Sequence, residues 1–186
     1  KGKIILNDPS VTGSGNALLS HLALNVWNVE EAKDFLRRMI RDQKAEITRD
    51  NRVTVESVAR GKHALALGAR VETQADFFDV GAPIAQALME DVFLSHADSV
   101  VGVPTVSPHA NATLVFLNWL LSKEGHAVLV KGAGNPGLRV DAPAEGINPI
   151  FFTRPEEKLY FDSEEAILFR GEMLEIARQV IAEAEK

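Results

Sequence analysis

The chain has 186 residues, of which 46% are hydrophobic and 25% are charged, a composition typical of a globular protein. Its formal net charge is −6 and no basic run occurs along it, which excludes a nucleic-acid partner. The absence of cysteine excludes disulfides, zinc–thiolate sites and thiol nucleophiles. No stretch approaches the ~18 consecutive apolar residues that a membrane-spanning helix needs. Because the chain begins with Lys1 rather than methionine, we expect any export signal to precede it.

The first third of the chain predicts a strand, a polar turn and three helices. Residues 3–7 form an apolar run typical of a buried strand, and residues 8–16 form a turn rich in Gly, Ser and Thr. An apolar helix is expected through residues 18–23. The next helix begins at Asn28, with Glu31 completing a capping box. A third helix begins after its cap residue and ends at a glycine; the cap is Asp50 or Asn51, and the glycine is Gly61.

The rest of the chain continues the alternation of strands and helices. Apolar runs predict further strands over residues 63–68, 84–88 and 99–104. Apolar residues at helical spacing predict helices over residues 72–79, 108–122 and 124–130, with a last helix that begins at Asp162 or Ser163. Strands that alternate with helices predict an α/β fold with a mostly parallel sheet.

The turn before the first long helix is the most informative candidate site. Glycines and hydroxyl residues at a helix start expose backbone N–H groups at the positive end of the helix dipole, where an anion can bind. The site residues expected here are Asp8, Ser10, Thr12, Gly13, Ser14, Gly15 and Asn16. The structural alternative is an ordinary helix cap, in which the Ser14 side chain accepts a hydrogen bond from the helix backbone. Neither a Walker A loop nor a dinucleotide-binding glycine pattern is present.

A second polar start precedes the third helix. Arg49 stands immediately before the predicted cap, where it could hold an anion. Its structural alternative is an exposed arginine beside a capped helix.

No pattern in the sequence predicts catalysis, a metal or a cofactor. None of the histidines has the spacing of a paired metal site, and no GxSxG elbow presents a nucleophile. We therefore predict a structural or solvent-exposed role for each of His21, His63, His96, His109 and His126. The sequence favours a binding protein over an enzyme, with no resident cofactor.

Several phrases together resemble a known family. They are KGKIILNDPSVTGSGN, ITRDNRVTVESVARGKHALALG, PHANATLVFLNWLLSKEGH and KGAGNPGLRVDAP. Across nearly the whole chain, this sequence resembles the family 1 extracellular solute-binding proteins of ABC transporters, in the iron(III)- and thiamine-type branch. The most specific element is the FLNWLLSKEG ending of the predicted helix near residues 111–125.

The resemblance implies a type II periplasmic-binding-protein fold, in which solute is trapped between two α/β lobes. Each lobe is a three-layer αβα arrangement with a mixed, mostly parallel sheet. By this resemblance, residues 1–91 and 151–186 form the second lobe, and residues 92–150 cross back to the first. Most of the first lobe is then expected to lie outside this chain.

The resemblance also implies ligand contacts at two places. One is the turn already described, and the other follows the predicted strand at Gly68, Ala69 and Arg70. Iron-binding members have adjacent tyrosines in this second region, whereas the only tyrosine here is Tyr160. This difference counts against ferric ion and leaves polar or anionic organic solutes.

The expected function is therefore the solute-binding component of a bacterial ABC import system. Its partners would be a small-molecule solute and the permease subunits in the membrane, and its location the periplasm or the extracellular face, with or without a lipid anchor. Two alternatives remain: the ligand-sensing domain of a transcription regulator, which shares this fold class, and an α/β hydrolase-like enzyme.

The predicted helix at residues 111–122 is apolar around most of its circumference. Such a helix is normally covered on more than one side. We therefore expect this chain either to expose an apolar patch or to form a homodimer through this helix.

Overall fold

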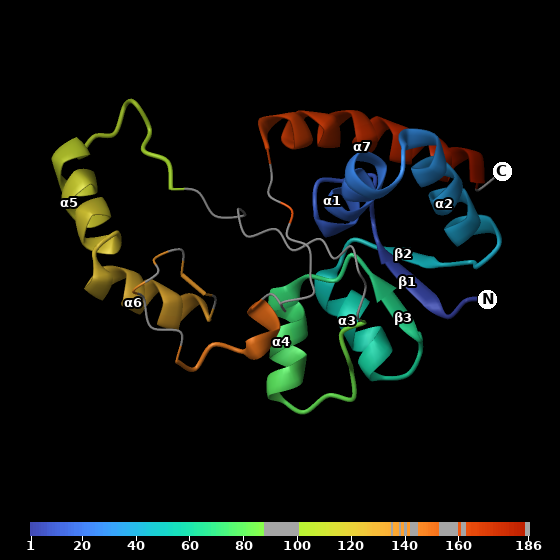
Figure 1. Ribbon diagram of the computed structural model, residues 1–186, viewed down its shortest axis with the longest axis horizontal. Helices are drawn as coiled ribbons and strands as arrows, with labels where there is room; N and C mark the ends of the chain where they lie inside the picture. Colours follow the sequence, from blue (N-terminus) through green and yellow to red (C-terminus); the bar gives the residue numbers. More distant parts are fainter. Residues whose placement is uncertain are drawn as a thin grey trace. The chain divides into compact units, whose positions relative to one another are not determined.

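The computed structural model describes residues 1–87, 101–134, 136–137, 139, 141, 145–152, 160 and 163–184 (Figure 1). The chain divides into two compact units. Unit 1 comprises Lys1–Ser95 and Glu156–Lys186, and unit 2 comprises His96–Pro155. The assignment of chain segments to lobes of a solute-binding fold stays a prediction, because a division by compactness does not identify a fold family.

Unit 1 contains a small parallel sheet. Its strands are β1 (Ile4–Asn7), β2 (Glu46–Thr48) and β3 (Leu65–Leu67), in the order β2-β1-β3. Both pairings of β1 are parallel, and Leu6 lies opposite Ile47 on one side and Leu67 on the other. The predicted α/β class is therefore confirmed, and all the described strand pairings are parallel.

Helices cover both faces of this sheet (Figure 1). On one face lie α1 (Ser14–His21), which continues as the π-helical turn η1 (Leu22–Val26), and α2 (Val29–Arg41). The C-terminal helix α7 (Glu164–Ala184) packs across both α1 and α2. On the other face, α3 (Asn51–Ala59) contacts all three strands and the adjacent α4 (Val71–Asp79). Unit 1 is therefore an αβα layered structure around three strands.

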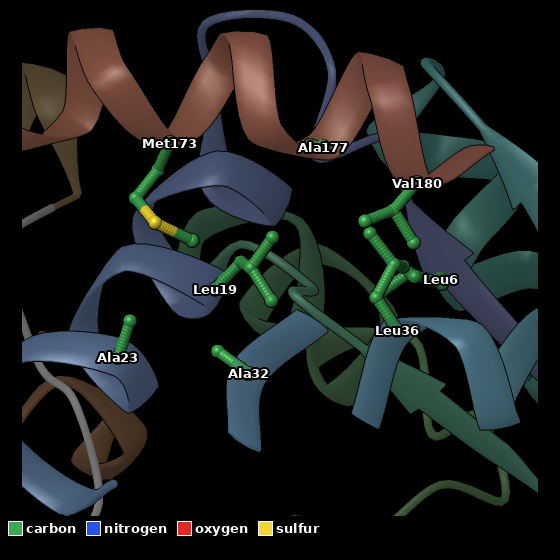
Figure 2. Close-up of a cluster of buried hydrophobic side chains, with 8 residues drawn as sticks. All are labelled: Leu6, Leu19, Ala23, Ala32, Leu36, Met173, Ala177 and Val180. Atoms are coloured by element: carbon green, nitrogen blue, oxygen red, sulfur yellow. The ribbon is translucent and has the colours of Figure 1, made fainter. Parts of the chain in front are cut away.

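The core of unit 1 lies between the sheet and α7 (Figure 2). Because side chains alternate along a strand, Leu6 points into this cluster while its neighbour Ile5, fully buried, points toward α3. The cluster consists of Leu6, Leu19, Ala23, Ala32, Leu36, Met173, Ala177 and Val180. It joins residues from both ends of unit 1, so α7 is an integral part of the fold.

Polar caps determine where two of the helices begin. At α2, Asn28 Oδ1 accepts a hydrogen bond from Glu31 N–H (3.1 Å), and Asn28 N–H donates to Glu31 Oε2 (3.2 Å), which confirms the predicted capping box. At α3, Asp50 Oδ1 accepts from the backbone N–H groups of Arg52 (2.8 Å) and Val53 (3.1 Å). Asp50 is therefore the cap, and Asn51 is the first residue of the helix.

Unit 2 contains α5 (Ala110–Leu120), α6 (Lys123–Ala133) and the 3₁₀ turn η2 (Pro149–Phe151). Helix α5 packs against α6, which begins at a Ser122 cap that accepts from Gly125 N–H at 3.1 Å. No residue of α5 is buried, and Val115 is 70% exposed. The predicted helix is present, and its exposed apolar side chains are Leu114, Val115, Phe116 and Trp119, with Leu121 following its end.

Three strand predictions need correction. Residues 84–87 form no strand, and Ile84 N–H instead donates locally to Ala82 O at 2.8 Å. Residues 101–104 are also not a strand; residues 88, 99 and 100 of these two predicted strands lie outside the described residues. The predicted buried strand at 63–68 is present only at Leu65–Leu67, and Leu65 is 39% exposed because β3 lies at the edge of the sheet. An apolar run alone does not distinguish a strand from a loop that packs on its neighbours.

Among the described residues, no helix has both the length and the apolar character needed to cross a bilayer.

Candidate functional site

Three turns meet at one edge of the sheet in unit 1. Strands β1, β2 and β3 are parallel, so their carboxyl ends, at Asn7, Thr48 and Leu67, lie along the same edge. Each strand is followed by a turn and a helix, namely α1, α3 and α4. Ligands of open α/β sheets bind outside the carboxyl ends of the strands, so this edge is the candidate site. We call it the carboxyl edge.

Two glycines let the turns after β1 and β3 approach one another. A Cβ atom on Gly15 would lie 2.0 Å from the Asn7 carbonyl oxygen. This distance is too short for any side chain, so only glycine fits at this position. A Cβ atom on Gly68 would lie 3.2 Å from Gly15 Cα, and Gly68 has a φ of +70°, which L-residues rarely adopt. The two segments expected to bind ligand are therefore in contact, although more than 50 residues separate them in the chain.

A chain of hydrogen bonds orients the amides at this edge. Gly15 N–H donates to Asn7 Oδ1 (3.3 Å), which leaves Asn7 Nδ2 to donate to Asn51 Oδ1 (3.0 Å). Ser14 Oγ donates to the same Asn51 oxygen (3.4 Å). Because a backbone N–H can only donate, the direction of every bond in this chain is fixed. The Oδ1 atom of Asn51 thus accepts from Asn7 and Ser14, and its Nδ2 group remains to donate to another partner.

Asn51 is a site residue that sequence reasoning missed. The sequence predicted it only as an alternative helix cap, a role that Asp50 takes instead. Since Asp50 supplies the cap, the Asn51 side chain is released from the helix backbone and bonds Asn7 and Ser14. One sequence signal could have indicated these roles: an Asp-Asn pair at a helix start after a strand, in which Asp50 caps the helix and Asn51 bonds other residues.

The second polar cluster centres on Asp8, whose side chain is only 8% exposed. Asp8 Oδ1 accepts from Ser10 N–H (2.8 Å) and Ser10 Oγ (2.6 Å), and Asp8 Oδ2 accepts from Arg49 Nε (2.8 Å). Burial acts to raise the pKa of Asp8, but the hydrogen bonds from Ser10 and Arg49 together outweigh it and hold the pKa below its usual value. Asp8 is therefore a charged structural anchor for Arg49.

Arg49 is exposed apart from this contact, with 71% of its side chain open to solvent. Its Nε is bound to Asp8, while a guanidinium carries five N–H donors in a planar fork. Asp8 thus neutralises part of the charge of Arg49 and fixes its orientation beside the carboxyl edge. The structure thus brings together Asp8, Ser10 and Arg49, which the sequence presented as parts of two separate candidate sites.

The helix starts at this edge differ in how they are capped. Helix α1 begins at Ser14, and its cap residue Gly13 has no side chain to cap it. The Ser14 side chain bonds Asn51 instead, so the structural alternative of a Ser14 cap is absent. Asn7 Oδ1 accepts from Gly15 N–H in the first turn, so that N–H group is already bonded. Helix α4 begins after Arg70 without a cap from Arg70, but the Glu72 carboxylate in its first turn accepts from the Glu72 backbone N–H. Uncapped helix starts leave backbone N–H groups for water or for a ligand oxygen, and the helix dipole favours a negative charge there.

The remaining predicted site residues fall into two groups. Thr12 is exposed, and Arg70 is exposed and pairs with Glu72 at 3.3 Å. By contrast, the Asn16 side chain is only 2% exposed and its Nδ2 donates to the carbonyls of Pro9 (3.5 Å) and Arg170 (3.3 Å). Ala69 O accepts from Gln74 Nε2 (3.0 Å). Asn16 and Ala69 therefore hold the turns in place.

No metal-binding cluster of three His, Asp or Glu side chains occurs among the described residues. His21 is buried at the end of α1, where its ring lies 4.5 Å from the ring of Tyr160, centroid to centroid. His21 is the seventh residue after Ser14 along this helix, a distance of about 10 Å along the axis. The Tyr160 ring thus packs at the opposite end of α1 from the candidate site.

The chemistry available at the carboxyl edge is that of recognition. It offers the Asn51 amide, the exposed Thr12 hydroxyl and the Arg49 guanidinium as donors, while the hydroxyls of Ser10 and Ser14 donate to Asp8 and Asn51. The buried Asp8 carboxylate is already bonded. No family model, curated protein or solved structure matches this chain.

Proposed function

We propose that this chain is part of a solute-binding protein of a bacterial ABC import system, and that it binds a small polar or anionic solute at the carboxyl edge of unit 1. The observation that carries the proposal is the convergence of the turns after β1 and β3 with Asn51 and Arg49. These groups present hydrogen-bond donors to one place, as an oxygen-rich solute requires.

The proposal extends to the mechanism of uptake. Solute would bind between two lobes of a type II periplasmic-binding-protein fold, and closure about a hinge would trap it. The closed form would then be recognised by the permease subunits, at the periplasmic or extracellular face of the membrane.

The donors at the edge also support a binding role over catalysis. A hydrolytic site needs a nucleophile within hydrogen-bond reach of a general base. The hydroxyls of Ser10 and Ser14 donate to Asp8 and Asn51, and neither hydroxyl bonds a histidine. The protein would therefore act without chemical change to its solute.

Inorganic phosphate titration of the ¹⁵N-labelled chain tests the site. We expect the amide signals of residues 13–15, 51 and 68–70 to shift together along one binding curve. Asn51→Ala should weaken binding roughly tenfold, the effect of losing one hydrogen bond to a charged group. Ser14→Ala should weaken binding by less, because the Ser14 hydroxyl donates to Asn51 and acts on the ligand only by orienting that amide. Asn118→Ala, which removes an exposed amide from α5, is the matched control and should bind as the wild type does.

Two results would contradict the site. One is phosphate-induced shifts confined to residues outside the three turns. The other is equal affinity in the wild type, Asn51→Ala and Ser14→Ala. Native mass spectrometry of protein purified from its own host would then identify the solute, by detecting a retained small molecule.

A further inference from the structure

The C-terminal helix reaches the β1–α1 turn through one arginine. Arg178 Nε donates to the carbonyl oxygen of Ser10 at 3.1 Å, a contact that spans 168 residues of sequence. Ser10 in turn donates its N–H and its hydroxyl to Asp8, and Asp8 accepts from Arg49. A continuous chain of hydrogen bonds therefore runs from α7 through the turn to the guanidinium of Arg49.

Arg178 is itself held in place. Its Nη1 forms an ion pair with Glu175, one turn earlier on α7. The residue before it, Ala177, is fully buried in the core cluster, as is Met173 (Figure 2). The packing of α7 thus fixes the backbone at Arg178. Arg178 can therefore hold the β1–α1 turn, which contains glycine, against α7.

This bond determines the orientation of one peptide group in the turn. The peptide bond between Ser10 and Val11 is trans, since no cis peptide occurs in the described part of the chain, and its C=O and N–H therefore point in opposite directions. Because Arg178 holds the carbonyl toward α7, the Val11 N–H points away from α7. Without this anchor, the peptide could rotate and the Asp8–Arg49 pair would lose one of its supports.

We propose that Arg178 is a positioning residue for the candidate site: it orients the Ser10 peptide and, through Ser10 and Asp8, the guanidinium of Arg49. This proposal rests on the proposed function only for its effect on ligand affinity. The effect on the turn itself holds whatever the site binds.

The test compares Arg178→Met, which keeps the apolar stem, with Arg178→Lys, which keeps a donor. The matched control is Arg41→Met, because Arg41 Nη2 makes the same kind of bond, from α2 to the Glu183 carbonyl of α7, at 2.6 Å. Glu175→Gln is a second control, since it removes the charge of the ion pair but keeps a side-chain oxygen that can accept from Arg178 Nη1. Two quantities are measured for each: amide hydrogen exchange of residues 10–15 without ligand, and affinity for inorganic phosphate.

We expect Arg178→Met to speed amide exchange in residues 10–15 and to weaken phosphate binding roughly tenfold, with a melting temperature equal to that of Arg41→Met. Arg178→Lys should recover part of both losses, and the two controls should leave the turn as in the wild type. Unchanged exchange in Arg178→Met, or an equal effect in Arg41→Met, would overturn the proposal. If the wild type binds no phosphate, that arm counts against the proposed function, while the exchange arm still decides the role of Arg178.

Discussion

Asp8 combines burial with a full negative charge. Burial alone would favour the neutral acid, but Ser10 and Arg49 donate to both carboxylate oxygens and lower the pKa. A carboxyl whose pKa is lower in the folded than in the unfolded chain stabilises the fold above the unfolded value, about 3.9, and loses this contribution as the pH falls through the folded value.

Asp8→Asn is therefore expected to destabilise the chain in a pH-dependent way. At pH 7 the loss in free energy of unfolding should be about 1–3 kcal/mol, since hydrogen bonds to a buried charged group are weakened. The difference from the wild type should be largest above about pH 4 and should narrow below it. Urea denaturation between pH 2 and pH 7 measures this difference. Asp34→Asn, at an exposed pair with Arg37, is the control and should cost about 0.5 kcal/mol or less. A difference that is independent of pH would contradict the role of the Asp8 charge.

Gly15 offers a second test at the scale of a single residue. A methyl group there would lie 2.0 Å from the Asn7 carbonyl oxygen, which is backbone and cannot rotate away. Gly15→Ala should therefore force the β1–α1 turn apart, weaken phosphate binding by more than tenfold and destabilise unit 1. Gly171 is the matched control, because it lies inside α7 with nothing within 4 Å of an added Cβ. Gly171→Ala should stabilise the chain by about 1 kcal/mol. Equal stability of the two variants by thermal unfolding would show that the close approach is absent.

At the scale of helices and strands, the sequence predicts the elements whose ends are determined by neighbouring residues in the chain. The capping residues Asn28, Glu31 and Asp50 locate two helix starts because they satisfy backbone N–H groups within their own turn. Strand β2 was not predicted, because Glu46–Thr48 has no apolar run and is a strand only through its pairing with β1. Residues 84–87 have the reverse character: an apolar sequence without a strand partner in the part of the chain that the structure describes.

The candidate site shows the same division. The glycine- and hydroxyl-rich turn was predicted from sequence, because glycine and serine favour turn conformations. The bonding of Asn51 to Asn7 and Ser14 was not, since the segments are 44 and 37 residues apart. The contact of Arg178 with Ser10 likewise depends on where α7 packs. Neither contact has a local signal.

Helix α7 is expected to be essential to unit 1. Met173 is fully buried between α7 and the helices of the N-terminal segment, whereas Leu168 on the same helix is 70% exposed. Met173→Ala should therefore lower the free energy of unfolding by about 2–5 kcal/mol through lost burial and a residual cavity. Leu168→Ala should change it by about 0.5 kcal/mol or less. Chemical denaturation followed by circular dichroism compares the two, and equal losses would mean that α7 does not pack on this core.

At the scale of the whole chain, the two units differ in how they bury apolar side chains. Unit 1 has a core to which both its N-terminal segment and α7 contribute. In unit 2, α5 has no buried residue and no charged one, and its polar side chains are limited to Asn111, Thr113 and Asn118. A helix that is apolar around most of its surface is normally covered.

We therefore expect the isolated chain to self-associate through α5. Leu114, Val115 and Phe116 are 55%, 70% and 54% exposed, and covering such side chains contributes ~1.5–3 kcal/mol each. Light scattering at micromolar concentration should report a mass above the 20.3 kDa of one chain, rising with concentration. The double variant Val115→Glu, Phe116→Glu should be monomeric and equally stable, because both positions face solvent in the single chain. Val80→Glu, at a 79% exposed site in unit 1, is the control and should associate as the wild type does. A wild type that stays monomeric at every concentration would mean that α5 is covered within its own chain, and dilution would then leave its Trp119 fluorescence unchanged.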